Sequence, residues 1–356
     1  MREQQYILKN QDSFELKHIF DCGQCFRWNE EDDNSYTGVI KQGVLNVQKR
    51  ENEIFFSGML DGDIKEIVTN YFDLNRNYSE IKEKLSKVDE NVNSSIKYGE
   101  GIRILNQDLW ETIISFIISA NNNIPRIKGI IERISKNYGK EIDWNGRKYY
   151  CFPTPEELRN VNTQNFRDLG TGFRDIRLFE TTQMILDKKV DLQSLYSADT
   201  LSAREALLSL SGVGPKVADC ILLFSDLKRF DVFPIDVWVR RVMNELYINN
   251  PDESKVNKKD IARIAKEKFG DLEGLAQQYL FYWKREAWIK ICNELVCSLH
   301  IFFTKFHSKN NKKSQNSGKK MIKIHKIPFL NLDLFKKQNQ AQKILKNILE
   351  KSTFLI

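Results

Sequence analysis

The stretch Leu210-Ser-Gly-Val-Gly-Pro-Lys-Val-Ala-Asp-Cys220 decides how the second half of the chain folds. Gly212 and Gly214 permit a tight hairpin with an exposed main chain, and Pro215 fits the first turn of a new helix. Main-chain N–H groups at a helix N-terminus bind phosphate through hydrogen bonds and the helix dipole. The stretch therefore predicts two helices joined by a phosphate-binding hairpin, which is formed by Gly212, Val213 and Gly214.

A lysine, and twenty residues later an aspartate, follow this hairpin. Lys216 lies in the first turn of the new helix, where the helix dipole and burial would both favour the neutral, nucleophilic amine. Twenty residues later, Phe233-Pro-Ile-Asp-Val-Trp238 again places a proline loop before a helix. Asp236 could cap this helix and also bring its carboxylate near the amine. Taken alone, Lys216 would be a solvated lysine and Asp236 an N-cap; their order in one hairpin unit predicts a catalytic pair.

The remaining pattern predicts an α+β fold. Short β-favouring runs at residues 26–28, 36–40, 44–47 and 54–56 alternate with Asn, Asp and Gly, which indicates a small N-terminal antiparallel β domain over residues 1–78. From residue 79 to 300 we expect a mostly helical helix–hairpin–helix domain. Its first stripe is Ile81, Leu85, Val88 and Val92. Further helices are expected at 109–120 with Asp108 as N-cap, then at 126–138, from 155, and at 203–209, 215–224, 236–246, 258–269 and 275–299.

Net charge is divided unevenly along the chain. The 356 residues include 55 Lys and Arg against 48 Asp and Glu, a formal net charge of +7. Residues 301–356 alone hold thirteen lysines against two acidic residues, a net charge of +11, which leaves −4 for residues 1–300. If residues 1–300 bind an anion, the attraction must therefore come from particular groups at the binding site and not from net charge. The polar run at 308–320 predicts that this basic tail is partly disordered, with a short helix at 340–350.

Composition also excludes several classes of protein. The longest apolar run, residues 109–120, is too short to cross a bilayer, and the N-terminus has no apolar region typical of a signal peptide. Six cysteines are too sparse for a disulfide framework. Cys22 and Cys25 have the spacing of half a zinc site, which Cys292 and Cys297 could complete, but reduced packed cysteines are the simpler interpretation. With four histidines, none of them central, we expect no metal and no cofactor.

The hairpin, Lys216 and Asp236 resemble the base-excision DNA glycosylase superfamily, and more narrowly the 8-oxoguanine DNA glycosylase/lyases. The resemblance covers about residues 1–298. Four further segments are similar to family motifs in the same order: Gly23-Gln-Cys-Phe-Arg-Trp28, Asn121-Asn-Asn-Ile-Pro-Arg126, Gly170-Thr-Gly-Phe-Arg174 and Ala276-Gln-Gln-Tyr-Leu-Phe281.

The resemblance implies a role for each matching residue. Lys216 would attack the sugar C1′ of a flipped nucleotide, and Asp236 would offset the positive charge that develops there. Gly23 would offer its carbonyl to the N7–H of 8-oxoguanine. Phe281 and Cys220 would sandwich the base, and Gln277 would contact its Watson–Crick edge. Taken alone, Gly23 would be a turn glycine, and Phe281 and Cys220 ordinary core residues.

Other residues would act on the DNA around the lesion. Asn121 would fill the gap that the flipped nucleotide leaves, Arg126 and Arg174 would donate to the cytosine opposite, and Phe173 would wedge beside it. Without the resemblance, these would be a polar loop and a solvated face. The chain departs from animal members at Trp238, where they carry a phosphate-contacting His, and at Lys284, where they carry an acidic residue.

The resemblance thus implies a bifunctional glycosylase and AP lyase that excises 8-oxoguanine opposite cytosine in base excision repair. Its partner would be damaged double-stranded DNA, and we expect a monomer that binds no membrane. We expect it to be cytoplasmic, at the nucleoid of a prokaryote, or in the nucleus of a eukaryote. Two alternatives remain: a glycosylase for other damaged purines, and a non-enzymatic DNA-binding module that uses the hairpin alone.

The charge asymmetry gives the first testable prediction. A chain truncated to residues 1–300 loses a segment of +11, so its DNA affinity should depend less steeply on salt concentration, while its choice of lesion is retained. The measurement is the slope of log K against log salt for both chains. Loss of base release at saturating truncated protein would instead assign the tail to the folded enzyme.

Overall fold

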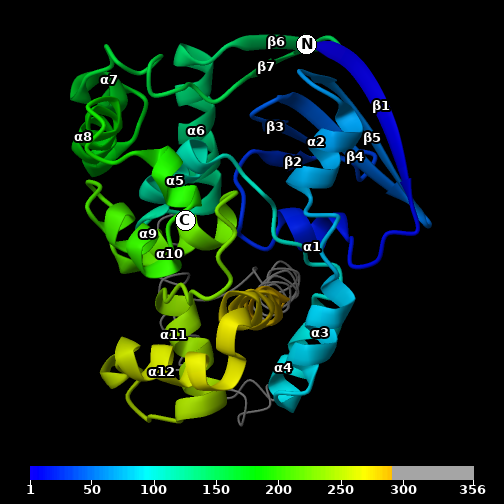
Figure 1. The fold of residues 1–356 in the computed structure, drawn as a ribbon, viewed down its shortest axis with the longest axis vertical. Coiled ribbons are helices and arrows are strands. Elements are labelled where there is room, and N and C mark those ends of the chain that lie inside the picture. The colour runs from blue at the N-terminus through cyan, green and yellow to red at the C-terminus, as the bar shows by residue number, and fades with distance from the viewer. Residues whose placement is uncertain (291–356) are drawn as a thin grey trace, which may run out of the picture. The chain divides into compact units, whose positions relative to one another are not determined.

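The computed structural model describes residues 1–290, which all belong to one compact unit. An antiparallel sheet with two short helices forms the N-terminal part, and helices form most of the rest (Figure 1). This confirms the expected α+β class. The predicted end of the last helix, the basic tail at 301–356 and the helix at 340–350 lie outside the described residues.

The N-terminal sheet has five strands in the order β1-β5-β4-β3-β2, and every neighbouring pair is antiparallel. The strands are β1 (Arg2–Lys9), β2 (Trp28–Glu30), β3 (Tyr36–Ile40), β4 (Gly43–Arg50) and β5 (Glu53–Leu60). Along β5, buried residues alternate with partly exposed ones, so one face of the sheet covers a core. The edge strand β1 was not expected, because its residues are mostly polar and only partly buried.

Two helices complete the core of this sheet, in a region where only strands and turns were expected. They are α1 (Leu16–Phe20) and α2 (Ile64–Tyr71). Phe20 of α1 stacks on Trp28 with ring centroids 4.2 Å apart, and the Trp28 indole donates a 2.9 Å hydrogen bond to the Tyr71 hydroxyl. The aromatic side chains of both helices therefore fix the start of β2, the strand at one edge of the sheet.

The helical part contains ten labelled helices among the described residues and one more helix at residues 273–290, here called the 273–290 helix. The ten are α3 (Tyr78–Ser86), α4 (Glu90–Tyr98), α5 (Leu109–Ser119), α6 (Ile124–Tyr138), α7 (Thr163–Asp168), α8 (Asp175–Leu186), α9 (Thr200–Leu208), α10 (Pro215–Phe224), α11 (Val237–Met243) and α12 (Lys258–Phe269). The expected bounds of α10 and α12 are confirmed residue for residue. Asp108 caps α5 as predicted by accepting from the Glu111 N–H at 3.0 Å.

Several expectations in the helical part were wrong. The stripe from Ile81 to Val92 belongs to two helices, because Asp89 caps a new helix by accepting from the Val92 N–H. No helix starts at 155, where residues 155–160 form turns. A hairpin of β6 (Glu141–Trp144) and β7 (Arg147–Tyr150) follows α6. The helix expected at 236–246 is α-helical only to Met243 and then continues as a short π-helix at Asn244–Ile248.

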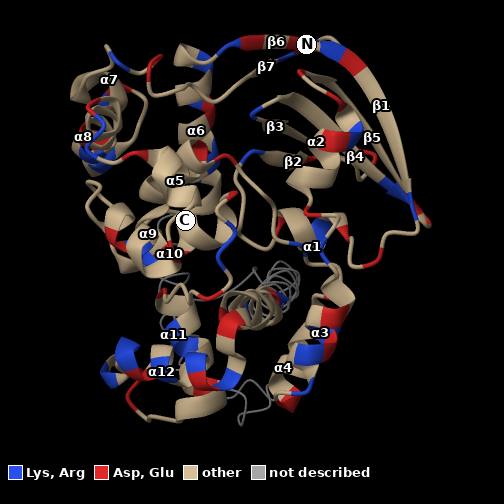
Figure 2. Ribbon diagram, viewed as in Figure 1, with Lys and Arg blue, Asp and Glu red and all other residues tan. Residues whose placement is uncertain are grey.

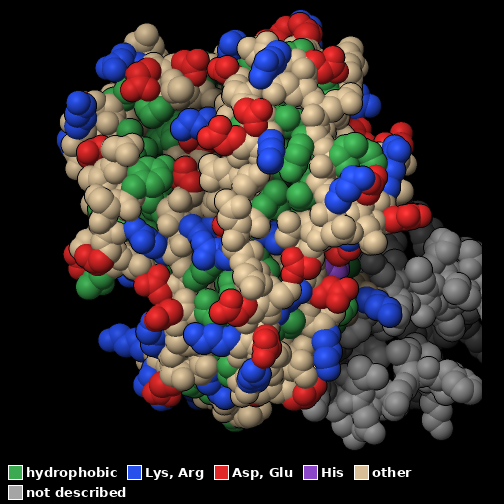
Figure 3. Space-filling view, turned by 45° about the vertical axis from the view of Figure 1, so that its right-hand side comes forward, with side chains coloured by type: hydrophobic (Ala, Val, Ile, Leu, Met, Phe, Trp, Pro, Cys, Tyr) green, Lys and Arg blue, Asp and Glu red, His purple; other side chains and the backbone are tan. Residues whose placement is uncertain are grey.

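Charges of both signs are interspersed over the described residues. Figure 2 shows basic and acidic segments alternating along α3, α4 and α12, and the face in Figure 3 carries mixed positive and negative side chains. This agrees with the small negative net charge of residues 1–300. Within residues 1–290, no helix has the length and apolar character needed to cross a bilayer.

A buried lysine links the turn after α10 to the N-terminal half of the chain. The Lys228 side chain is 8% exposed, its Nζ donates to the Ile104 carbonyl, and it lies 3.7 Å from the Asp73 carboxylate. Burial, opposed in part by Asp73, lowers the pKa of Lys228 from its usual 10.5 to about 7. The folded protein therefore holds this amine neutral at a pH where the unfolded chain binds a proton.

This shift predicts a pH dependence of stability. Between the two pKa values the unfolded state binds the extra proton, so the free energy of unfolding rises with pH by up to about 1.4 kcal/mol per pH unit. Lys228→Met should remove that rise, so the stability of the wild type relative to the variant should increase from about pH 7.5 to pH 9. Urea denaturation at several pH values measures it. Lys188→Met is the matched control, because Lys188 is exposed and, like Lys228, has a positive φ, which is 55° at Lys188. A flat difference would contradict a neutral buried Lys228.

Candidate active site

The hairpin between α9 and α10 is partly exposed, with Gly214 exposed, Gly212 half-buried and Val213 buried. Gly212 has φ of +81°, and a Cβ there would come within 2.9 Å of the Arg177 side chain, so only glycine fits without rearrangement. Gly214 is exposed and is the N-cap of α10, with nothing within 4 Å of a Cβ built there. The Thr181 hydroxyl donates to the Ser211 carbonyl at 2.7 Å and holds the hairpin on α8. The first turn of α10 is therefore open to an anion.

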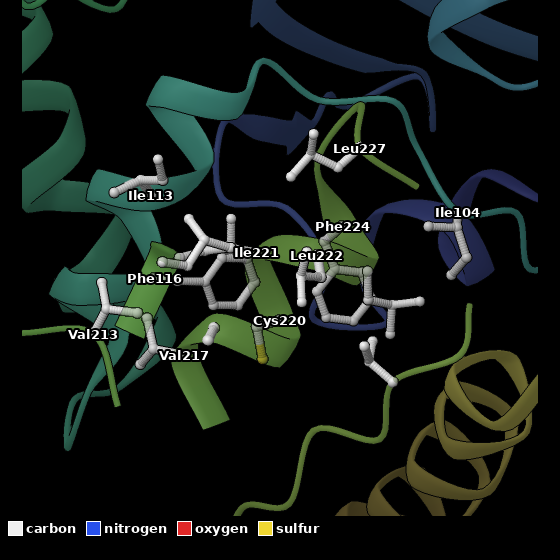
Figure 4. Close-up of a cluster of buried hydrophobic side chains, with 14 of the residues drawn as sticks. Ile104, Ile113, Phe116, Val213, Val217, Cys220, Ile221, Leu222, Phe224 and Leu227 are labelled. Atoms are coloured by element: carbon white, nitrogen blue, oxygen red, sulfur yellow. The ribbon is translucent and has the colours of Figure 1, made fainter. Parts of the chain in front are cut away.

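Lys216 and Asp236 both affect the pKa of one thiol of α10. The Cys220 side chain is 3% exposed, and burial raises its pKa to about 11, with Lys216 acting to lower this pKa and Asp236 to raise it. Both charged groups therefore lie near Cys220. The Lys216 ammonium also lies 5.3 Å from the centroid of the Phe116 ring. Figure 4 shows Cys220 at the edge of the apolar cluster around α10, with its sulfur pointing away from Phe116 and Phe224.

Asp236 is fixed by the helix that it begins. It is the N-cap of α11, and its Oδ1 accepts from the Val239 N–H at 2.7 Å. The residue is half-buried, as is Lys216. The cap determines where the carboxylate lies, so the two roles that the sequence suggested for Asp236 are compatible.

The loop that contains Gly23 leaves one carbonyl free. Among residues 21–24, the other three carbonyls each accept from a side chain far along the chain: that of Asp21 from Arg285, that of Cys22 from Gln278 at 2.7 Å, and that of Gln24 from Gln107 at 2.7 Å. No described residue donates to the Gly23 carbonyl. Gly23 has φ of +90°, a conformation that glycine adopts without strain. The loop therefore holds a fixed, unused acceptor.

Phe281 and Gln277 of the 273–290 helix have different relations to this loop: Phe281 lies beside Gly23, and Gln277 has a buried side-chain acceptor. A Cβ built at Gly23 would lie 3.5 Å from the Phe281 ring, and Phe281 packs against the same apolar cluster that contains Cys220. Gln277 is 5% exposed, and its Oε1 is buried with no hydrogen-bond partner. Buried acceptors without partners are rare in folded proteins, which is consistent with a ligand-binding role for this oxygen.

The side chains of the three asparagines between α5 and α6 differ in their hydrogen bonding. Asn122 donates to the Ile118 carbonyl at 3.1 Å, and Asn123 caps α6 by accepting from the Arg126 N–H at 3.0 Å. Asn121 is exposed, has φ of +52°, and its side chain makes no hydrogen bond to a described residue. Of the three side chains, only that of Asn121 makes no hydrogen bond to a described residue, so its amide is free to contact a ligand.

Arg174, Phe173 and Arg126 lie around the same loop. The Arg174 side chain is 1% exposed, and it donates to the carbonyls of Ala120, Asn121 and Thr171. These bonds use four of its five N–H groups. Its guanidinium also lies 4.3 Å from the centroid of the Phe173 ring, which is 56% exposed. Arg126 is exposed and donates to the Gly170 carbonyl at 3.3 Å.

The two departures from the family pattern have separate partners. Trp238 meets Trp288 edge-on with ring centroids 6.1 Å apart, and the Arg241 guanidinium lies 5.2 Å from the Trp238 ring. Lys284 forms an ion pair with Glu245 at 2.9 Å. This corner therefore uses an aromatic pair and a salt bridge.

The structure also identifies residues that the sequence did not indicate. Arg285, Gln278 and Gln107 hold the loop around Gly23, and their partners lie 83 to 264 residues away along the chain. No local pattern marks them. The only sequence signal is that Gln278 follows Gln277 within the motif at 276–281.

Within residues 1–290, no group of three or more His, Cys, Asp and Glu could hold a metal ion. The Cys22 thiol donates to the Ile19 carbonyl at 3.3 Å and the Cys25 thiol to the Phe20 carbonyl at 3.7 Å. Burial raises the pKa of Cys22 to about 11 and holds that of Cys25 well above its usual range, which opposes the thiolate form that zinc requires. Cys292 and Cys297 lie outside the described residues.

Comparison with known proteins finds matches to both parts of the chain. The family model "8-oxoguanine DNA glycosylase, N-terminal domain" matches residues 6–113, and the model "HhH-GPD superfamily base excision DNA repair protein" matches residues 114–269. A protein of Saccharomyces cerevisiae named N-glycosylase/DNA lyase is 34% identical over 264 residues, 67% of this chain and 69% of the yeast protein. A probable N-glycosylase/DNA lyase of Methanothermobacter thermautotrophicus is 33% identical over 219 residues, 56% of this chain and 68% of that protein.

A solved structure matches over most of the described residues. It is the Clostridium acetobutylicum 8-oxoguanine glycosylase/lyase in complex with double-stranded DNA that contains cytosine opposite 8-oxoguanine. It is 42% identical with a TM-score of 0.75, and the match covers 81% of this chain and 98% of the clostridial chain. The chain therefore belongs to the 8-oxoguanine DNA glycosylases, within the HhH-GPD superfamily of base excision DNA repair proteins.

Proposed function

We propose that the protein is a bifunctional DNA glycosylase and AP lyase that excises 8-oxoguanine opposite cytosine and then cleaves the strand. The observation that carries the choice of substrate is the Gly23 carbonyl, which no described residue uses. Its relatives in yeast and Clostridium support the class of reaction by their names. Its substrate, double-stranded DNA, would place the enzyme in the compartment that holds the chromosome.

Recognition would depend on one hydrogen atom. 8-Oxoguanine carries a hydrogen on N7 and can donate to the Gly23 carbonyl, whereas guanine has a lone pair there and would be repelled. A buried acceptor left without its donor costs about 1–3 kcal/mol, so the mismatch disfavours guanine in the pocket. Gln277 Oε1, buried and without a partner, supports contact with the N–H groups of the Watson–Crick edge.

Base release would use Lys216 as nucleophile. Its Nζ lone pair forms a bond to C1′ while the C1′–N9 bond breaks, and the base leaves with that electron pair and takes up a proton. The half-buried carboxylate of Asp236 would stabilise the positive charge that develops on the sugar. The nitrogen, which has given one proton to the departing base, then forms the C1′=N bond of a protonated Schiff base as the C1′–O4′ bond breaks and O4′ takes up a proton from water. Loss of a C2′ proton expels the 3′ phosphate and cuts the strand.

DNA would be held by main-chain and placed side-chain groups. The open first turn of α10, after Gly212, Val213 and Gly214, suits a phosphate. Asn121 and Phe173, both exposed, suit the gap and the wedge beside it. Arg126 is the exposed arginine of this site, and Arg174 would need to leave its loop carbonyls to reach a base.

The lysine role predicts a covalent intermediate. With borohydride and a duplex containing 8-oxoguanine opposite cytosine, the wild type should form a protein–DNA adduct, because reduction converts the Schiff base into a stable amine. Lys216→Gln should form none. Lys259, at the second position of α12 as Lys216 is in α10, gives the control Lys259→Gln, which should retain trapping. An adduct that persists in Lys216→Gln would assign the nucleophile elsewhere.

The aspartate role predicts a loss of catalysis without a loss of fold. Asn caps helices as well as Asp does, so Asp236→Asn should keep α11 and DNA binding. It removes the negative charge, and single-turnover base release should fall by about a hundredfold or more. Asp199→Asn is the matched control, since Asp199 caps α9 in the same way at 3.0 Å. Unchanged turnover in Asp236→Asn would leave Asp236 as a cap alone.

A further inference from the structure

Arg285 lies close to two of the groups that are proposed to contact the lesion base, the Gly23 loop and the Phe281 ring. Its Nη2 donates to the Asp21 carbonyl, two residues before Gly23. Its Nη1 would lie 3.3 Å from a Cβ built at Gly23. Its guanidinium carbon lies 5.3 Å from the centroid of the Phe281 ring, within the range of a cation–π contact. One side chain therefore contacts both the loop that carries the free carbonyl and the aromatic residue beside it.

The environment of Arg285 shows that it is held in place. Its side chain is 13% exposed, and Glu286 accepts from Nη2 at 2.9 Å and from Nε at 3.2 Å. The guanidinium is thus fixed by a carboxylate and a carbonyl, with its carbon 5.3 Å from the centroid of the Phe281 ring. Lysine could supply the charge but not the planar fork that donates to both oxygens.

The rest of the loop does not depend on Arg285. Gln278 holds the Cys22 carbonyl and Gln107 holds the Gln24 carbonyl, so the residues on either side of Gly23 keep their anchors without it. Removing Arg285 should therefore loosen the spacing between Gly23 and Phe281 and leave the fold intact.

We propose that Arg285 is a positioning residue for the lesion base. It sets the gap between the Gly23 carbonyl and the Phe281 ring into which the flipped base enters. The proposal rests on the proposed function, and it adds a residue that acts on the base pocket and not on the sugar chemistry. A displacement of about 1 Å in such a gap is enough to cost a large factor in rate.

The test separates the base pocket from the sugar chemistry. Arg285→Met keeps a long apolar side chain and loses the hydrogen bond and the charge. With 8-oxoguanine opposite cytosine, we expect its single-turnover base release to fall about ten- to hundredfold. With a duplex that already contains an abasic site, there is no base to position, so strand cleavage and borohydride trapping by Lys216 should match the wild type.

Three further measurements complete the design. Arg285→Lys should remain impaired in base release, because a lysine ammonium restores the charge but not the planar guanidinium that donates to Asp21 and Glu286 together. Arg263, which is 60% exposed and paired with Glu267 in α12, provides the control Arg263→Met, which should be unaffected in both assays. The thermal midpoints of the variants should lie close to that of the wild type.

The outcomes are distinct. Base release by Arg285→Met at the wild-type rate, or an equal loss of base release and abasic-site cleavage, would overturn the positioning role. If Arg285→Met does not fold, full activity of Arg285→Lys would overturn it as well. A wild type that cleaves abasic sites but releases no 8-oxoguanine would overturn both this inference and the proposed function.

Discussion

The buried side chain of Gln24 is the constraint on which the rest of the site depends. Its Nε2 donates to the carbonyls of Ile19 and Arg103, and its Oε1 accepts from the Leu105 N–H, all within 2.8 Å. A fully buried amide must satisfy these groups, so the loop after α1 cannot shift relative to residues 103–105. Gln107 extends the connection, since it donates to both the Gln24 and Phe224 carbonyls. The acceptor at Gly23 and the helix that carries Lys216 are thereby held in one frame.

Local signals predicted the helical part well and the N-terminal part less well. Pro at the first helical position and a side-chain cap determined the starts of α10 and α12. The apolar spacing from residue 81 to 92 predicted one helix. The spacing continues unchanged across the point at which Asp89 caps a second helix. Strand β1 and helices α1 and α2 become regular through packing against β5 and the aromatic core, which no short window of sequence contains. The proposed boundary at residue 78 stays a prediction.

The site divides in the same way. Lys216, Cys220 and Asp236 belong to one hairpin unit, so their sequence spacing already indicates that they meet. Gly23 and Gln277 could be named only through motif resemblance, and their proposed contacts with a base remain predictions. Arg285 had no signal at all, because its partner at Asp21 is 264 residues away. Functional residues that lie within one supersecondary unit can be predicted from their spacing in the sequence. Residues that hold separate units together cannot be predicted in this way.

The buried state of Arg174 has an energetic consequence for reading the opposite strand. Its guanidinium donates to the carbonyls of residues 120 and 121, so these hydrogen bonds would have to break before Arg174 could reach a base. Contact with a base would exchange those internal bonds for external ones, and a base with fewer acceptors could not compensate the exchange. The loop would thus act as a threshold: a well-matched partner base releases the arginine, and a poorly matched one leaves it in place. Discrimination would then arise from the stability of the empty enzyme as much as from the contacts in the complex.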